Sequence, residues 1–194
     1  MKNFTIDAQL IRSAMACQDK KSVRYHLNGF LLSASGHIVA TNGNILFKSD
    51  YNLNPDSPEP SHIEADSIIR IEGTIPLNSY TCEFLFKDDF SGHVQTDKGK
   101  LFPFVIVDGK YPDYERVIPE SSRSEYSNGF ACNVTLLAIL AKVFGKDAIV
   151  DIEHATENDS ILITCLKMES AIFVLMPCRS KKDYRRNFAV KKAA

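Results

Sequence analysis

Apolar residues recur along this chain with two periods, one typical of helices and one typical of strands. Residues 8–18 and 134–144 carry apolar side chains three or four positions apart, which predicts two amphipathic helices. Asp7 and Asn133 stand directly before these segments, where a short polar side chain caps the first free N–H groups. Gly145 follows the second segment and is expected to end it.

Shorter apolar segments, bounded mostly by Gly, Asp, Asn or Ser, predict β-strands. Asn42-Gly43 is the strongest hairpin signal in the chain. A brief helix is expected at 67–72, between an N-cap at Asp66 and an end at Gly73. The expected strands are 4–6, 23–33, 37–41, 45–49, 61–65, 80–87, 92–96, 101–107, 129–132, 148–153, 161–166 and 171–178.

These elements form a repeat. The three capping residues stand at positions 7, 66 and 133, at intervals of 59 and 67 residues, and each marks a unit of strand, helix and three strands. One unit cannot cover both its helix and its sheet, so we expect pairs of units, with helices on one face and antiparallel sheets on the other. The predicted fold class is therefore α+β. Unit three lacks a partner within this chain, which predicts a homo-oligomer.

Residues 108–119, with the sequence Asp-Gly-Lys-Tyr-Pro-Asp-Tyr-Glu-Arg-Val-Ile-Pro, form a stiff segment after the second unit. Its prolines fix φ and favour extended backbone around them. The polar residues after it show no periodicity, which is typical of a linker. The predicted organisation is a complete domain of two units at 1–119, a linker at 120–128, a half domain at 129–180 and a basic tail at 181–194.

Composition limits the possible partners. The chain has 194 residues and a net charge of −1, so any attraction to nucleic acid must be local. No apolar run is long enough to span a membrane and the N-terminus lacks the core of a signal peptide, so we expect a cytoplasmic protein with no membrane partner. The five scattered cysteines include no CxxC pair and are expected to be reduced core thiols.

No group of residues has the spacing of a catalytic or metal site. Asp56 and the pair Asp88-Asp89 lie in turns and need no acid–base role, and there is no Gly-rich phosphate loop. We therefore expect no enzymatic activity, no metal and no cofactor. The five histidines stand singly, without an HExxH or CxxC partner: His26, His37, His62, His93 and His154.

Four segments together resemble the bacterial β sliding clamps, the processivity rings of replicative polymerases. They are Val-Arg-Tyr-His-Leu-Asn-Gly at 23–29, Val-Ala-Thr-Asn-Gly at 39–43, the segment 108–119, and Phe-Val-Leu-Met-Pro-Cys-Arg at 173–179. They occur in the family's order, in its middle domain, its closing segment and the end of its last domain. The chain departs from the family by lacking the first domain and half of the last, and by continuing past 179. A phage or prophage is a plausible source of such a shortened clamp.

The resemblance implies a cleft between the middle domain and the C-terminal segment that binds short peptides of partner enzymes. Aliphatic side chains and a methionine suit Leu or Phe anchors, and Arg116 and the backbone at Gly43 would orient the peptide. In isolation, such residues would be ordinary core. Cys178 and Ser180 replace larger apolar residues of the family, which implies a shallower pocket or altered specificity. The matching positions are Leu27, Thr41, Gly43, Leu46, Pro112, Arg116, Val117, Val174, Leu175, Met176 and Pro177.

The resemblance also implies that the helices face duplex DNA and contact its phosphates without reading bases. Basic residues on or beside the expected helices would make these contacts, although such residues are also typical of a solvated helix face. Gln18, Arg24 and Tyr25 match a family segment associated with DNA contact. The full set is Arg12, Gln18, Lys20, Lys21, Arg24, Tyr25, Arg70, Lys142 and Lys146.

From residue 179 onward the tail holds seven Lys or Arg against one Asp, with Tyr184 and Phe188 between them. This composition suits attraction to phosphates combined with stacking, but it also suits a solubilising tail. A third hypothesis is that Phe188 and Val190 fold back into the cleft and regulate access to it.

The sequence thus predicts a clamp-like protein that tethers a polymerase or another DNA-processing enzyme to duplex DNA through the cleft. One alternative is a non-ring interaction protein that competes with the host clamp for clamp-binding peptides. Another is a DNA-binding regulator on a clamp fold. Family rings contain about twelve units, so closing a ring would take about four copies of this chain.

Overall fold

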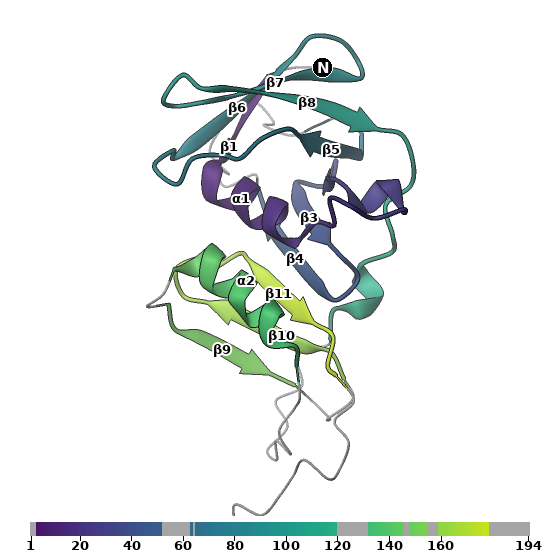
Figure 1. Ribbon diagram of the computed structural model, residues 1–194, viewed down its shortest axis with the longest axis vertical. Coiled ribbons are helices and arrows are strands. Elements are labelled where there is room, and N and C mark those ends of the chain that lie inside the picture. The colour runs from purple at the N-terminus through teal and green to yellow at the C-terminus, as the bar shows by residue number, and fades with distance from the viewer. Residues whose placement is uncertain are drawn as a thin grey trace, which may run out of the picture.

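A computed structural model describes residues 3–51, 63, 65–119, 132–145, 148–154 and 159–178. Within them the chain forms one antiparallel sheet of eleven strands with two α-helices (Figure 1), which is the predicted α+β class. The helices are α1 (Ala8–Cys17) and α2 (Val134–Phe144), with 3-10 turns at η1 (Tyr25–Leu27) and η2 (Glu115–Val117). The strands are β1 (Phe4–Asp7), β2 (Phe30–Leu32), β3 (His37–Thr41), β4 (Ile45–Asp50), β5 (Ser67–Ile71), β6 (Thr81–Phe86), β7 (Ser91–Thr96), β8 (Leu101–Val107), β9 (Val150–Glu153), β10 (Ile161–Cys165) and β11 (Ile172–Leu175).

One sheet runs through the three segments that were predicted as repeat units, which keep the names units one, two and three below. Its strand order is β1-β6-β7-β8-β5-β2-β3-β4-β11-β10-β9. The third unit enters through β11, which pairs with β4 so that Phe173 lies opposite Phe47 and Val174 lies opposite Leu46. Unit three therefore has a neighbour in this chain after all, namely unit one, and the expectation that it has none is wrong. Its other side, at β9, pairs only with β10 among the described strands.

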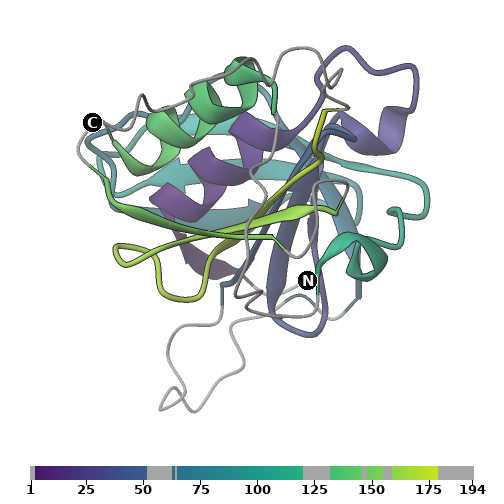
Figure 2. The same ribbon diagram turned by 90° about the horizontal axis from the view of Figure 1, so that it is seen from below.

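Both helices lie on the same face of the sheet, as predicted. Figure 2 shows α1 and α2 side by side over the strands, and the two helices contact each other. Two of the three predicted caps are confirmed, because the Asp7 carboxylate accepts a hydrogen bond from the Gln9 N–H at 2.6 Å and Asn133 Oδ1 accepts one from the Thr135 N–H at 2.9 Å. Gly145, with φ of 93°, ends α2 at the predicted position.

Two predicted elements are wrong. The segment predicted as a helix at 67–72 instead contains the strand β5 (Ser67–Ile71), and Asp66 accepts a hydrogen bond from the Ala34 N–H instead of capping. The isoleucines of β5 favour a strand, and pairing with both β2 and β8 satisfies its backbone. Unit two thus lacks its helix. The long strand predicted at 23–33 is instead η1 followed by the short β2.

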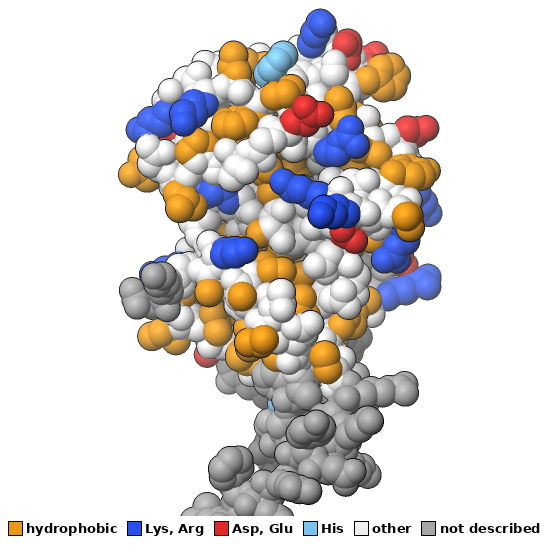
Figure 3. Space-filling view, in the orientation of Figure 1, with side chains coloured by type: hydrophobic (Ala, Val, Ile, Leu, Met, Phe, Trp, Pro, Cys, Tyr) orange, Lys and Arg blue, Asp and Glu red, His pale blue; other side chains and the backbone are white. Residues whose placement is uncertain are grey.

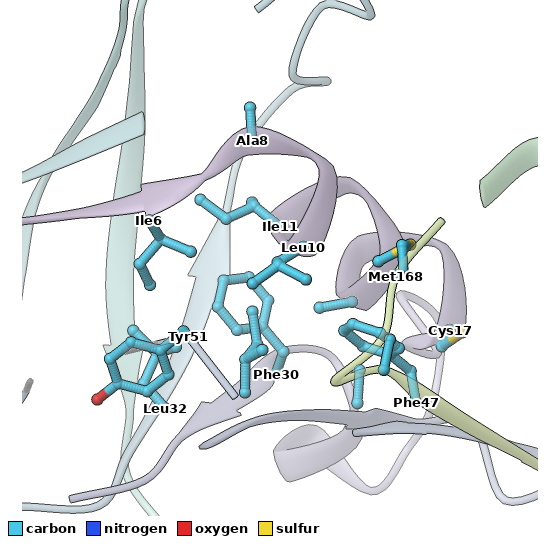
Figure 4. Packing of buried hydrophobic residues seen from close by; sticks show 14 of the residues in the cluster. Ile6, Ala8, Leu10, Ile11, Cys17, Phe30, Leu32, Phe47, Tyr51 and Met168 are labelled. Carbon is cyan, nitrogen blue, oxygen red and sulfur yellow. The ribbon is translucent and has the colours of Figure 1, made fainter. Parts of the chain in front are cut away.

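The main core fills the space between the helices and the sheet. Leu10 and Ile11 of α1 lie over Phe30 in the centre of the sheet (Figure 4). Phe173 connects the units, since its ring centroid lies 4.9 Å from that of Phe47 and 4.9 Å from that of Phe144. The same buried cluster therefore runs through both ends of the molecule.

All five cysteines are free thiols, and three of them, Cys17, Cys82 and Cys165, are buried. Burial raises the pKa of Cys82 to about 11. A thiol with such a pKa is protonated at neutral pH and reacts slowly, which fits its role as an apolar core residue. None of the described helices has the length and apolarity needed to cross a membrane.

The predicted strands at 61–65 and 129–132 and the tail at 181–194 lie wholly or largely outside the described residues, as does the linker at 120–128.

Candidate functional site

A second apolar cluster lies on the face of the sheet opposite the helices. Tyr111 is buried in it, and the Tyr111 hydroxyl accepts a hydrogen bond from the Thr41 N–H of β3 at 3.0 Å. Burial raises the pKa of this tyrosine, so the hydroxyl stays neutral. The contact fastens the stiff segment after β8 onto β3. The buried members of the cluster are Leu31, Val39, Leu46, Ile68, Tyr111 and Val174.

A cavity of about 140 Å³ opens beside this cluster, where the β3–β4 turn, the segment around η2 and the end of β11 meet. Sites for drug-sized ligands measure roughly 300–1,000 Å³. This cavity therefore suits one large apolar side chain rather than a whole small molecule. Its lining residues are Arg24, Leu27, Thr41, Gly43, Asn44, Ile45, Leu46, Pro112, Asp113, Tyr114, Val117, Val174 and Met176.

The turn that forms one wall is held by its own hydrogen bonds. Asn42 Oδ1 accepts from the Asn44 N–H at 2.9 Å and the Ile45 N–H at 3.0 Å, and Thr41 Oγ1 donates to the Ile45 carbonyl at 2.8 Å. Gly43 has φ of 87°, and a Cβ there would lie 3.3 Å from Arg24 Nη2. The wall is therefore fixed before any ligand arrives, and Gly43 leaves room for the guanidinium.

Eight of the eleven predicted cleft residues line this cavity, and three do not. Leu175 is fully buried on the helix side, because alternation along β11 sends Val174 to one face and Leu175 to the other. Arg116 is exposed, and Arg116 Nε lies 2.6 Å from Asp113 Oδ2. Pro177 lies past the end of β11 and outside the lining. The eight are Leu27, Thr41, Gly43, Leu46, Pro112, Val117, Val174 and Met176.

Five lining residues were not predicted for the cleft: Arg24, Asn44, Ile45, Asp113 and Tyr114. Asn44 and Ile45 directly follow Gly43, and Asp113 and Tyr114 directly follow Pro112. These four residues could therefore have been predicted from their position next to predicted cleft residues. Arg24 was assigned to DNA contact instead. Its position at the cavity depends on how η1 folds next to the β3–β4 turn, which no local pattern reveals.

The residues predicted for DNA contact are dispersed. Arg12 Nη1 donates to the carbonyls of Pro76 at 2.9 Å and Ser79 at 3.0 Å, so this guanidinium holds a loop in place. Gln18 is buried, and neither polar atom of its amide has a hydrogen-bond partner among the described residues.

Arg70 lies on the wrong face for its predicted role, because it belongs to a strand rather than a helix. Alternation along β5 puts Arg70 on the same side as Ile68, which packs in the cluster opposite the helices. Tyr25 is 58% exposed and approaches Gly109 rather than α1. Lys146 lies outside the described residues.

The remaining basic residues gather on the helix face. Lys20, Lys21 and Lys142 are exposed, and Figure 3 shows several basic side chains near the middle of this face. A groove of about 840 Å³ lies between α1, the segment after β5 and the end of α2, and its lining contains no acidic residue. Its basic lining residues are Arg12, Lys20 and Lys142. Across the described residues, no group of three or more His, Cys, Asp or Glu is placed to hold a metal ion.

Sequence comparison finds similarity to two curated proteins, both named Beta sliding clamp. The protein of Pseudomonas aeruginosa is 36% identical over 134 residues, which cover 60% of this chain and 34% of that protein. The protein of Salmonella typhimurium is 30% identical over 152 residues, which cover 75% of this chain and 38% of that protein. The chain thus spans little more than a third of the length of these relatives. No family model matches the chain.

Solved structures give the same result for the fold. The DNA polymerase III subunit beta of Pseudomonas aeruginosa superposes with a TM-score of 0.65 at 21% identity, over 92% of this chain and 67% of that one. The chain is related to the bacterial β sliding clamps. It has the sliding-clamp fold, as the residues quoted from its sequence predicted.

Two further solved structures share this fold. The DNA polymerase III beta subunit of Thermotoga maritima superposes with a TM-score of 0.64 at 15% identity, over 92% of this chain and 66% of that one. A Pseudomonas aeruginosa sliding clamp bound to griselimycin superposes with a TM-score of 0.63 at 21% identity, over the same shares of 92% and 66%.

Proposed function

We propose that this protein is a clamp-like tether that has no catalytic activity. It binds a short peptide of a polymerase or another DNA-processing enzyme in the 140 Å³ cavity and holds that enzyme on duplex DNA. One observation carries the proposal: segments around positions 43, 114 and 175, far apart in the sequence, surround a single apolar cavity. The relationship to sliding clamps supports it.

The chemistry of the cavity favours a single apolar anchor. Leu46 and Val174 are buried, and the flexible thioether of Met176 adapts to aliphatic and aromatic partners. Fully burying one Leu or Phe side chain contributes about 1.5–3 kcal/mol. Useful affinity therefore also needs polar contacts along the peptide. The guanidinium of Arg24 and the backbone of the turn at Gly43 line the cavity and can supply these contacts.

Peptide binding is tested with a fluorescein-labelled synthetic decapeptide that carries Leu-Phe near its C-terminus, followed by fluorescence polarisation. We expect Val117→Asp to weaken binding at least tenfold, about 1.4 kcal/mol, because a carboxylate in the apolar cavity loses its hydration. Val23→Asp is the matched control, since Val23 is 98% exposed and lies outside the lining. Unchanged affinity in Val117→Asp, or no binding to the wild type, would contradict the proposed site.

Contact with DNA is tested separately on the helix face, with a fluorescent 30-base-pair duplex and a series of salt concentrations. The double variant Lys20→Glu, Lys21→Glu is expected to weaken binding and to lower the salt slope by about two, because each lost phosphate contact lowers it by about one. The control is the double variant Lys87→Glu, Lys100→Glu, because these two lysines are exposed on turns away from α1. Equal slopes in both double variants would exclude Lys20 and Lys21, which follow the end of α1, from the DNA contact.

The alternative function is competition with the host clamp for clamp-binding peptides, without DNA. One observation favours it: residues expected to contact DNA have other positions, since Arg12 donates to the carbonyls of Pro76 and Ser79 and Arg70 lies on the face of the sheet opposite the helices. A protein that binds the decapeptide but shows no affinity for the duplex at low salt would support the competitor over the tether.

A further inference from the structure

Unit two covers its part of the sheet without a helix among its described residues. Units one and three place α1 and α2 on the same face of the sheet (Figure 2). In unit two, the irregular segment 72–80 follows β5 instead. Its Ile75 is buried in the main core, whereas its Leu77 is 85% exposed. A helix with its side chains is about 10–12 Å across. A single irregular chain fills less of the layer, so a groove remains beside α1.

This groove, the helix-face groove, is the one of about 840 Å³ between α1, the segment after β5 and the end of α2, and its walls are tied together. Gln9 Nε2 donates to the Val143 carbonyl at 3.4 Å, which joins α1 to the end of α2. Arg12 Nη1 donates to the carbonyls of Pro76 and Ser79, which joins α1 to the segment after β5. Side chains of α1 therefore fix both neighbouring walls before any ligand arrives.

The lining of the helix-face groove combines apolar side chains with cations. Its charged residues are Arg12, Lys20 and Lys142, and none of its residues is acidic. In the described part of the chain these three cations form no ion pair, so their charge is available to a ligand. Most of the other lining residues are apolar, among them Met15 and Leu77. The groove therefore suits a ligand that is both apolar and negatively charged.

We infer that the helix-face groove binds an acidic amphipathic helix of a partner protein, at the place where unit two has no helix of its own. Apolar side chains on one face of such a helix would cover Met15 and Leu77. Carboxylates beside that face would meet Lys20 and Lys142, which are exposed. Arg12 adds a guanidinium whose position is already fixed by two carbonyls. Shape and charge therefore select the same partner.

Duplex DNA satisfies only part of this lining. Its phosphates would pair with the cations, but its polar backbone offers no apolar group to cover Met15 and Leu77. Lys20 is shared with the proposed DNA contact, so the partner helix and the duplex are expected to exclude each other. The inference goes beyond the proposed tether. It depends neither on peptide binding in the 140 Å³ cavity nor on binding of DNA.

The helix-face groove is tested with a fluorescein-labelled synthetic helix that carries leucines on one face and glutamates on the other, followed by fluorescence polarisation. We expect Leu77→Gln to weaken its binding about tenfold, because the variant loses the burial of one leucine side chain. Leu166→Gln is the matched control, since Leu166 is 76% exposed and lies outside the lining. The 30-base-pair duplex is measured on the same variants, and its affinity is expected to stay unchanged because glutamine alters no charge.

The cations are tested by reversing one charge. Lys142→Glu is expected to weaken binding of the acidic helix about fivefold, as for the loss of an exposed charge pair. Lys100→Glu is the control, because Lys100 is also exposed and lies outside the lining. A synthetic helix with lysines in place of the glutamates is expected not to bind the wild type.

Failure of the wild type to bind the acidic helix would overturn the inference, and so would equal affinities in Leu77→Gln and Leu166→Gln. If Leu77→Gln weakens the duplex as much as the acidic helix, the groove belongs to DNA and the inference is wrong. A Leu77→Gln protein that loses the acidic helix but binds the fluorescein-labelled decapeptide normally is folded and supports the groove. A wild type that binds the acidic helix but not the decapeptide would contradict the proposed function alone.

Discussion

Replacing Phe173 by alanine is expected to lower the free energy of unfolding by about 3–5 kcal/mol, the usual cost of removing a buried phenyl ring. Phe173 is fully buried, and its ring lies between Phe47 of β4 and Phe144 of α2. Those two elements belong to different units. The pairing of β11 with β4 fixes the backbone beneath the ring, so the space left by the ring is not expected to close. Urea denaturation followed by circular dichroism measures the change.

Leu166→Ala is the control for this prediction, because Leu166 belongs to the same unit and is 76% exposed. Its effect is expected to stay within about 0.5 kcal/mol, as for most surface substitutions. A loss below about 1 kcal/mol in Phe173→Ala would show that the junction between units one and three does not depend on this ring. Affinity for the decapeptide should fall in parallel, since Val174 of the cavity follows Phe173 directly.

Tyr111→Ala is expected to lower the free energy of unfolding by about 3 kcal/mol and to abolish peptide binding. Tyr111 fastens the segment before η2 to the outer face of the sheet, and Pro112, Tyr114 and Val117 of that segment form one wall of the cavity. Losing the ring removes the packing that positions this wall. Denaturation and fluorescence polarisation measure the two effects on the same protein.

Tyr111→Phe separates the hydrogen bond from the packing. It keeps the ring but leaves the Thr41 N–H without its 3.0 Å partner, which costs about 1–3 kcal/mol when the group stays buried. Peptide binding should then weaken without disappearing. Wild-type affinity in Tyr111→Ala would mean that the segment does not form a wall of the binding site.

Phe173 and Tyr111 pack on opposite faces of the sheet at the junction of β4 and β11. Phe173 packs beneath the β4–β11 junction on the helix side, and Tyr111 packs with Leu46 and Val174 on the other side. The cavity exists only where units one and three meet. The stability of that junction and the integrity of the candidate site are therefore coupled, so a variant that loosens one is expected to damage the other.

Local signals in the sequence were sufficient for much of the fold. The caps at Asp7 and Asn133, the end of α2 at Gly145 and the hairpin at Asn42-Gly43 each depend on a few neighbouring residues, and all are confirmed. Most strands followed from short apolar runs for the same reason. Eight of the predicted cleft residues also gather at one cavity, although that grouping came from a family resemblance and not from periodicity.

Only the tertiary structure decided the features that depend on strand pairing over long distances. The segment at 67–72 became a strand because β2 and β8 supply partners on both sides, and that change moved Arg70 to the face opposite the helices. Pairing of β11 with β4 gave unit three its neighbour and turned Leu175 into the core. Capping and turn geometry are fixed within a few residues. The register of a strand, and the face of the sheet on which each of its side chains lies, depend on partner strands tens of residues away, which no local pattern contains.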